Sequence, residues 1–504
     1  MDRVFKTPEL VSMICAHLPP QFMLVSRHFF HGMLPHHWET TKVSSLFTRG
    51  LIPADWVRQD KKTEVLLSRP LTPESMSRFH FYAPFIKIIE LGFFAASLNL
   101  NDWSPLIAYA QTTRLLPNLV QVAYVGPELE PLTVFLNSSV RMINLSSLRV
   151  SFVKEVLDHI AIICPEAHQL EFYPSSGHYI DNFSLEDIPS QTFVSLAKFR
   201  DLRRLTSGVA ILQSHSLQLL AELPYLAFLQ VEAGYLHEVK NVQLCRQLPA
   251  DSFPSLTILN IDLPTSQDVK RFWDLVPLKK LIEVHIFIQS ADDSDQMQFI
   301  PSLCRGSPLI RALLLDFPRS GDSEPLYRIG ADMFEHLRRL PLNHFFSVTY
   351  ARLDFERPWN TLAMAWPQIQ EIRLINQPAN LEDFMSLSAS LPNLSTIECD
   401  FSFAKMANDI ERNWEPTENS RFYPGLKRFI IKQPEIKDLA ASKSRTLDDL
   451  AKFFAYFWPS AQTTISLSIE SELGPGPGGW IYEDGLFNLF TRLVKAHVRA
   501  FHGV

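Results

Sequence analysis

A six-residue pattern, apolar-x-x-apolar-x-apolar, recurs from about residue 86 to about residue 467 and constrains the fold of this chain more than any other feature. The last two apolar positions are two residues apart, which is the side-chain period of a strand with one buried face. Each copy therefore predicts one short strand. The clearest copies are Leu256, Leu259 and Ile261; Ile310, Leu313 and Leu315; Ile369, Ile372 and Leu374; and Leu426, Phe429 and Ile431.

The first apolar positions fall near residues 86, 119, 145, 167, 202, 226, 256, 281, 310, 342, 369, 394, 426 and 462. This spacing fits one strand and one helix or looser connection per unit. Between copies the apolar residues shift to helical spacing, as at Val269, Phe272, Trp273 and Val276. We predict an α/β fold with a curved solenoid over residues 81–480. The alternative is an ordinary α/β domain with evenly spread strands.

The chain begins with a helical pattern. Thr7-Pro8-Glu9 is a favourable helix start, and Pro19-Pro20 must end that helix. A second apolar face follows and is expected to stop at Pro35. We predict two or three short helices in residues 1–43, a connector in residues 44–80, and a C-terminal capping helix in residues 481–504.

The N-terminal segment resembles an F-box, especially the fungal type. The residues that carry the resemblance are Thr7-Pro8-Glu9-Leu10, Ile14, Leu18, Leu24-Val25-Ser26-Arg27-His28-Phe29 and Leu34-Pro35-His36-His37-Trp38. The copies of the apolar pattern resemble the degenerate leucine-rich repeats found behind F-boxes. The F-box resemblance implies a Skp-type adaptor as partner and, through it, a cullin-RING ubiquitin ligase. The implied adaptor-binding residues are Pro8, Leu10, Ile14, Leu18, Val25 and Trp38.

One departure from the F-box pattern leaves a second interpretation open. The segment from Leu18 to Val25 is about one helical turn shorter than in the family and has no Asp-Leu-Leu. The protein could therefore be a ligase-independent scaffold whose shortened F-box serves only as a cap.

The sequence predicts no enzyme. Glycine is scarce, 17 residues against 35 prolines, and the glycine-rich loop at residues 473–480 lacks the Lys-Ser/Thr ending of a phosphate-binding loop. The histidines His31, His36 and His37 have no recognised ligand spacing with a neighbouring acid. We expect no catalytic residue, no metal site and no cofactor.

Charge and cysteine content limit the partners. The net charge is −7, and no block of basic residues is long enough to follow a nucleic acid, which we do not expect as a partner. No apolar run approaches the length of a membrane span, so a membrane is not expected either. The five cysteines are scattered, which favours a reducing compartment, cytoplasmic or nuclear.

If the apolar positions of each strand point inward, the alternating residues line the concave surface of the solenoid. We predict these partner-binding residues: Glu232, Asp262, Glu283, His285, Phe287, Asp316, Glu371, Arg373, Glu398 and Asp400. This largely acidic set suits a basic, or mixed basic and apolar, segment of a substrate protein. The alternative is a solvated face with no ligand.

Overall fold

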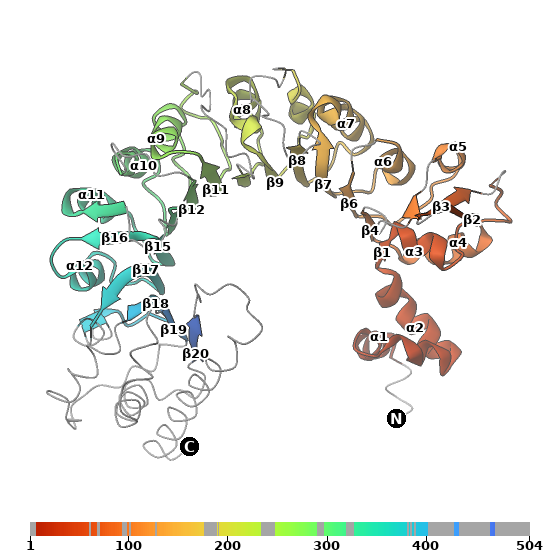
Figure 1. Ribbon diagram of the computed structural model, residues 1–504, viewed down its shortest axis with the longest axis horizontal. Helices are drawn as coiled ribbons and strands as arrows, with labels where there is room; N and C mark the ends of the chain where they lie inside the picture. Colours follow the sequence, from red (N-terminus) through yellow and green to blue (C-terminus); the bar gives the residue numbers. More distant parts are fainter. Residues whose placement is uncertain are drawn as a thin grey trace, which may run out of the picture. The chain divides into compact units, whose positions relative to one another are not determined.

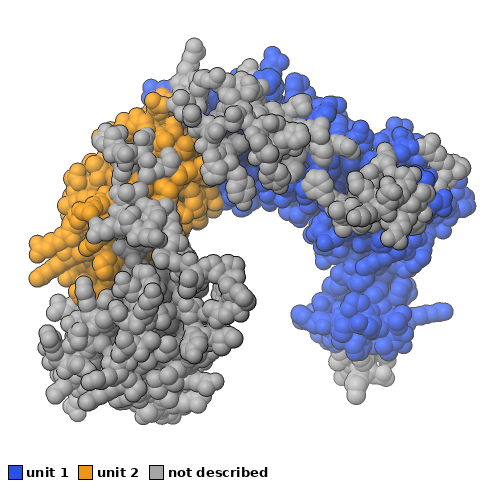
Figure 2. Space-filling view, in the orientation of Figure 1, with its two compact units in different colours: residues 1–256 blue, residues 257–504 orange. Residues whose placement is uncertain are grey.

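The computed structural model falls into two compact units, residues 1–256 (unit 1) and residues 257–504 (unit 2), shown in Figure 2. It describes residues 7–59, 62–67, 71–92, 98–99, 102–126, 129–175, 189, 191–232, 247–289, 297–318, 327–380, 383, 386–387, 390–401, 428–432 and 464–468. The predicted capping helix at residues 481–504 lies outside them. Over these ranges, no helix has the length and apolar character needed to cross a bilayer.

Unit 1 is built on parallel strands in the order β1-β4-β6-β7-β8-β9-β10. Their bounds are β1 Thr40–Lys42, β4 Ile88–Leu91, β6 Gln121–Val125, β7 Met142–Arg149, β8 Gln169–Ser175, β9 Arg204–Gly208 and β10 Phe228–Glu232. Strand order in space follows strand order in the chain, apart from the small strands that pair elsewhere. The unit is therefore a row of repeats, each packed on its neighbours.

Unit 2 is built on parallel strands in the order β11-β12-β13-β15-β17-β18-β19-β20. Their bounds are β11 Ile258–Leu263, β12 Glu283–Ile288, β13 Ala312–Asp316, β15 Phe345–Thr349, β17 Glu371–Ala379, β18 Thr396–Phe401, β19 Arg428–Lys432 and β20 Thr464–Ser468. A separate parallel pair, β14 (Tyr327–Gly330) and β16 (Ala351–Asp354), lies beside this sheet. The predicted α/β repeat of strand and connection is confirmed in both units.

The apolar pattern determines which residues of each strand are buried. In β11 the residues Leu259 and Ile261 are fully buried, while Asn260 and Asp262 remain half-buried on the other face. The first apolar residue, Leu256, is buried two residues before the strand begins. The same two-residue lead holds in most repeats, so this residue closes the turn into the strand and the other two fill the core.

The connections lie on one side of the strands, as Figure 1 shows. They are α5 Ser104–Thr112, α6 Glu130–Phe135, α7 Val150–Ile163, η5 Val194–Lys198, η6 Val209–Leu212 and α8 Ser214–Ala221 in unit 1, and α9 Ser266–Leu275, α10 Phe299–Gly306, α11 Ala331–Leu337 and α12 Pro358–Ala365 in unit 2. Helix α9 confirms the predicted helical spacing, because Val269, Phe272 and Trp273 are all buried. Its N-terminus is capped by Thr265, whose hydroxyl accepts a hydrogen bond from the Asp268 amide.

The position predicted near residue 145 was misplaced. Strand β7 begins at Met142, so its leading apolar residue is Val140, followed by Ile143 and Leu145. The sequence from Val140 to Val150 matches the pattern twice, once from Val140 and once from Leu145. Pairing with β8 selects the first match, and the register shifts between Leu145 and Leu148 where the second would start.

The N-terminal helical segment consists of α1 (Pro8–Ala16), the 3-10 turn η2 (Pro20–Leu24) and α2 (Arg27–Trp38). Its small core is formed by Val11, Cys15 and Met33, with Leu18, Met23 and Phe29 packed against it. The expected stop at Pro35 was wrong, because α2 runs through this proline to Trp38. Pro35 and His31 one turn earlier are both exposed, so water can satisfy the carbonyl that loses its partner.

The segment predicted as a connector also contains strands. It contains the helices α3 (Val43–Thr48) and α4 (Ser77–Tyr82), and β2 (Ala54–Gln59) and β3 (Lys62–Leu67) form an antiparallel hairpin between them. The hairpin is joined by β5 (Leu98–Asn99), which pairs in parallel with β3.

Candidate functional site

The alternating strand residues of unit 2 form continuous rows across the sheet. Strand register aligns Asn260, His285 and Leu314 in one row, and Asp262, Phe287 and Asp316 in the next. All six side chains are half-buried, in contrast to their fully buried neighbours on the same strands. The predicted partner-binding residues of these strands therefore share one face, with Phe287 flanked by Asp262 and Asp316.

Arg373 changes the charge predicted for the next part of this face. Its Nε donates to Glu371 Oε1 and lies 3.8 Å from Glu398 Oε2. Glu398 is only 5% exposed, and strand register places it beside Arg373 on the same face of the sheet. Asp400 is placed by register, opposite Lys432. The sequence marked these residues as separate ligand-binding groups, whereas the fold pairs Arg373 with two of the acids.

His285 lies beside an acid and an aromatic ring. Its Nε2 is 3.1 Å from Glu283 Oε1, and its ring stands edge-on to Phe345 at a centroid distance of 5.5 Å. Burial lowers the pKa of His285, and the nearby Glu283 carboxylate only partly opposes this. A neutral imidazole at pH 7 leaves the negative charge of Glu283 uncompensated.

Glu232, the one predicted partner-binding residue in unit 1, belongs to a cluster that sequence reasoning missed in part. Gln230 Nε2 donates to Glu232 Oε1 at 2.6 Å. Tyr173 lies near both Glu171 and Glu232; burial, followed by these carboxylates, raises its pKa above the ordinary range. Glu171 and Tyr173 alternate with the buried Leu170 and Phe172, so the period-two argument applied to residues 169–175 would have found them.

A second candidate surface lies on the N-terminal helical segment and is apolar. We call it the apolar patch: Leu10, Met13 and Ile14 on α1, and Phe22, Leu24 and Val25 at η2. Its most exposed members are Leu24 at 89%, Met13 at 66% and Val25 at 65%. Leu10, Ile14 and Val25 were among the predicted adaptor-binding residues, while Met13, Phe22 and Leu24 were not.

The remaining predicted adaptor-binding residues lie away from the apolar patch or support it. Pro8 begins α1, and Leu18 packs against the small core. Trp38 is only 5% exposed; its ring packs on Tyr82 at 4.6 Å, and the Arg49 guanidinium lies over it at 4.8 Å. Trp38 therefore packs α2 against Tyr82 of α4 and Arg49 at the end of α3, and its part in adaptor binding stays a prediction.

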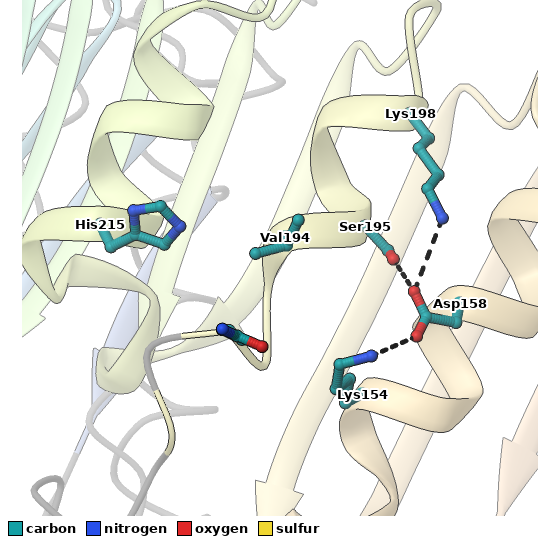
Figure 3. Close-up of a pocket in the computed structure, with 7 residues that line it drawn as sticks. Lys154, Asp158, Val194, Ser195, Lys198 and His215 are labelled. Carbon is teal, nitrogen blue, oxygen red and sulfur yellow. Dashed lines mark hydrogen bonds and ion pairs between the residues drawn. The ribbon is translucent and has the colours of Figure 1, made fainter.

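On the helix side of unit 1 a cavity of about 560 Å³ contains a group of charged residues. Asp158 on α7 accepts hydrogen bonds from Lys154 Nζ at 2.6 Å and from the Ser195 hydroxyl, and Lys198 Nζ lies at 3.6 Å (Figure 3). The hydrogen bonds from Lys154 and Ser195 lower the pKa of Asp158, so its carboxylate remains charged at neutral pH. The cavity is also lined by Gln191, Val194 and His215.

The same arrangement recurs in unit 2. Asp274 on α9 accepts hydrogen bonds from Lys270 Nζ at 3.2 Å, four residues earlier in the helix, and from the Ser302 hydroxyl at 2.6 Å. Arg305 Nη2 lies 3.5 Å from Asp274 Oδ1. Burial raises the pKa of Asp274, but the hydrogen bonds from Ser302 and Lys270 outweigh it and the pKa is lowered. In both groups a lysine donates a hydrogen bond to the aspartate Oδ2. A serine hydroxyl donates to Oδ1, and a basic side chain three residues after that serine forms an ion pair with the same oxygen.

We call these two groups the repeat clamps, Asp158 with its partners and Asp274 with its partners. Each joins a helix to the connecting element of the next repeat. An uncharged counterpart joins Asn360 on α12 to the hydroxyl of Ser386. A lysine, a serine and an aspartate close together could suggest catalysis, but the recurrence of the group indicates a structural link between repeats.

The four cysteines that the structure describes, Cys15, Cys164, Cys304 and Cys399, are free and buried. Burial raises the pKa of both Cys164 and Cys304 to about 12, far from the values of nucleophilic thiolates. No group of three or more His, Cys, Asp or Glu side chains is placed to hold a metal ion within the same stretches.

Comparisons with known proteins give coarse likenesses only. No family model matches the chain, and no curated protein matches it. Among solved structures, a complex of Rad7 and Elc1 from yeast is 14% identical, with a TM-score of 0.29 over 69% of this chain and 76% of that chain. A TLR13–ssRNA13 complex is 12% identical, with a TM-score of 0.33 over 77% of this chain and 58% of that chain.

Proposed function

We propose that this protein is a substrate-recognition subunit of a Skp–cullin–F-box type ubiquitin ligase. In this proposal the N-terminal helices form an F-box that docks a Skp-type adaptor, and the strand face of a leucine-rich-repeat solenoid holds the substrate. The chain does no chemistry itself, because it acts by bringing the substrate close to the ubiquitin-carrying enzyme.

The apolar patch carries this proposal. Exposed apolar side chains scattered singly are ordinary, but six large ones within residues 10–25 support an interaction site on this segment. They do not fill the segment's own core, which Val11, Cys15 and Met33 already form. A helical adaptor that covered Leu10, Met13 and Ile14 would bury a surface now facing water.

A second function, a ligase-independent scaffold, is favoured by the geometry of η2. The short link from Leu18 to Val25 forms only a five-residue 3-10 turn between α1 and α2. A shortened F-box of this kind could cap the first repeat and leave the strand face to bind a partner without any ligase.

Co-purification with a Skp-type adaptor separates the two functions. We expect the intact chain to bind at micromolar concentration, and a Leu10→Asp/Ile14→Asp variant to bind about tenfold more weakly or worse, because buried interface side chains contribute most of the affinity. Met364→Asp is the matched control, since Met364 on α12 is 76% exposed and lies outside the apolar patch. Failure of the intact chain to bind would leave the scaffold function.

The strand face is expected to select basic segments. On a peptide array graded in Lys and Arg content, we expect retention to rise with positive charge and to fall by about tenfold in a Glu283→Lys variant, because like charges oppose each other. The matched control is Glu335→Lys, which makes the same change on the outer helix α11. Equal losses in both variants would place recognition elsewhere.

A further inference from the structure

The turns that lead into β12, β13 and β15 of unit 2 carry a concentration of positive charge. These turns are residues 276–282, 306–311 and 338–344, and they contain five Lys or Arg residues and no Asp or Glu. Their charged side chains and one histidine form what we call the basic edge: Lys279, Lys280, Arg311, Arg338, Arg339 and His344. All six residues are exposed. They come from three repeats, so only the stacking of the repeats brings them together.

Backbone hydrogen bonds hold the three turns side by side. The Ile282 carbonyl accepts hydrogen bonds from the amides of Arg311 at 2.7 Å and Ala312 at 3.1 Å. The Arg311 carbonyl in turn accepts hydrogen bonds from the amides of Asn343 at 3.2 Å and His344 at 3.0 Å. Neighbouring strands lie about 4.8 Å apart, so the backbones of Ile282 and His344 are separated by roughly 10 Å. An extended segment of about three residues has that length.

Most of this charge is not compensated within the chain. Arg338 donates to Glu335 of α11 at 2.8 Å. Among the residues that the structure describes, three members of the basic edge form no ion pair: Lys279, Arg311 and Arg339. Burial raises the pKa of Cys304 on α10, and the charge of Arg339 partly opposes this, so Arg339 lies close to the helix that precedes the turn at residues 306–311.

The fold does not need charges in these turns. The equivalent turns before β17 and β18, residues 366–370 and 391–395, have no charged side chain. The turns of the basic edge also expose two large apolar residues, Ile282 at 39% and Leu309 at 53%. Ile282 directly precedes Glu283, where β12 begins the acidic strand face. The two surfaces therefore adjoin each other but differ in charge, and the basic edge combines cations with apolar contact area.

We propose that the basic edge docks an acidic segment of a partner protein, whose carboxylates pair with Lys279, Arg311 and Arg339. Apolar side chains of the same segment pack on Ile282 and Leu309. Each guanidinium can hold a carboxylate through two parallel hydrogen bonds, which an exposed ammonium cannot do. A protein segment fits better than a nucleic acid, because the two exposed apolar residues match side chains and not phosphates. This surface does not depend on the ubiquitin-ligase proposal.

Fluorescence anisotropy of the full chain tests this surface with three labelled probes: a Glu/Leu peptide, a Glu/Ser peptide of the same charge, and a single-stranded oligonucleotide. We expect saturable binding of the Glu/Leu peptide that weakens about tenfold in Arg311→Glu, because a cation is replaced by a like charge. Arg271→Glu is the matched control, since Arg271 is exposed on α9 and outside the basic edge. Circular dichroism of each variant checks that the fold is retained.

Leu309→Ser tests the apolar part of the surface. We expect it to weaken the Glu/Leu peptide about fivefold and to leave the Glu/Ser peptide unchanged, because only the first peptide loses apolar contact. Three results would each overturn the proposal: an unchanged affinity in Arg311→Glu, an equal loss in Arg271→Glu, or tighter binding of the oligonucleotide than of the Glu/Leu peptide. The last of these would assign the basic edge to a nucleic acid.

Discussion

Replacing Ile286 by Asp is expected to unfold the repeats around β12, whereas replacing its neighbour Phe287 by Asp is expected to leave them folded. Ile286 is fully buried, and its register neighbours Ile261 and Leu315 are fully buried as well. A carboxylate there would lie among buried apolar side chains, so we expect a loss of roughly 4 kcal/mol or more. Phe287 lies on the half-buried face, and its loss should cost about 1 kcal/mol.

Urea unfolding followed by hydrogen exchange of β11, β12 and β13 measures both variants. Exchange distinguishes a local effect from a global one, which matters in a chain of two units. If both variants lost protection equally, the two faces of the strand would not differ in burial, and the period-two interpretation of the strand face would fail.

Trp366→Ala is expected to destabilise unit 2 by about 3–5 kcal/mol, the usual cost of removing a buried Trp side chain. The indole is 2% exposed and packs against Phe346 at 4.8 Å and Phe334 at 5.4 Å. Its Nε1 also donates to the buried Leu340 carbonyl at 3.0 Å, which links neighbouring repeats.

Trp366→Phe separates these two contributions. Phenylalanine keeps much of the apolar contact and loses the hydrogen bond, so we expect a smaller cost of about 1–3 kcal/mol, the penalty for an unsatisfied buried carbonyl. Urea midpoints and exchange of the Leu340 region give both values. Equal destabilisation by Ala and Phe would mean that the hydrogen bond, and not the packing, dominates.

The strands were predictable because their signal is local. A buried strand needs alternating apolar residues wherever it lies, and Leu259 with Ile261, or Leu313 with Leu315, shows that alternation directly. The signal failed where it was duplicated, from Val140 to Val150, because only pairing with β8 could choose between two registers. The local pattern also failed to predict that α2 continues through Pro35. The helix can continue because water reaches the carbonyl of His31, and solvent access cannot be inferred from the local sequence.

The candidate sites were less predictable, because they depend on residues far apart in the chain. The sequence identified acidic residues on alternate strand positions, yet it could not show that Arg373 lies between Glu371 and Glu398. Nor could it show the pairing of Asp158 with Ser195, which is set by the packing of η5 on α7. Both contacts form only once successive repeats are stacked.

The recurring apolar pattern by itself determined that this protein is a row of parallel strands with connecting helices, because burial of one strand face is a property of each repeat alone. The tertiary structure decided which polar groups meet: the acids paired with Arg373, the two repeat clamps, the apolar patch left outside the small N-terminal core, and the cavity beside η5. Those contacts join neighbouring elements whose separation in sequence varies, so no fixed spacing records them.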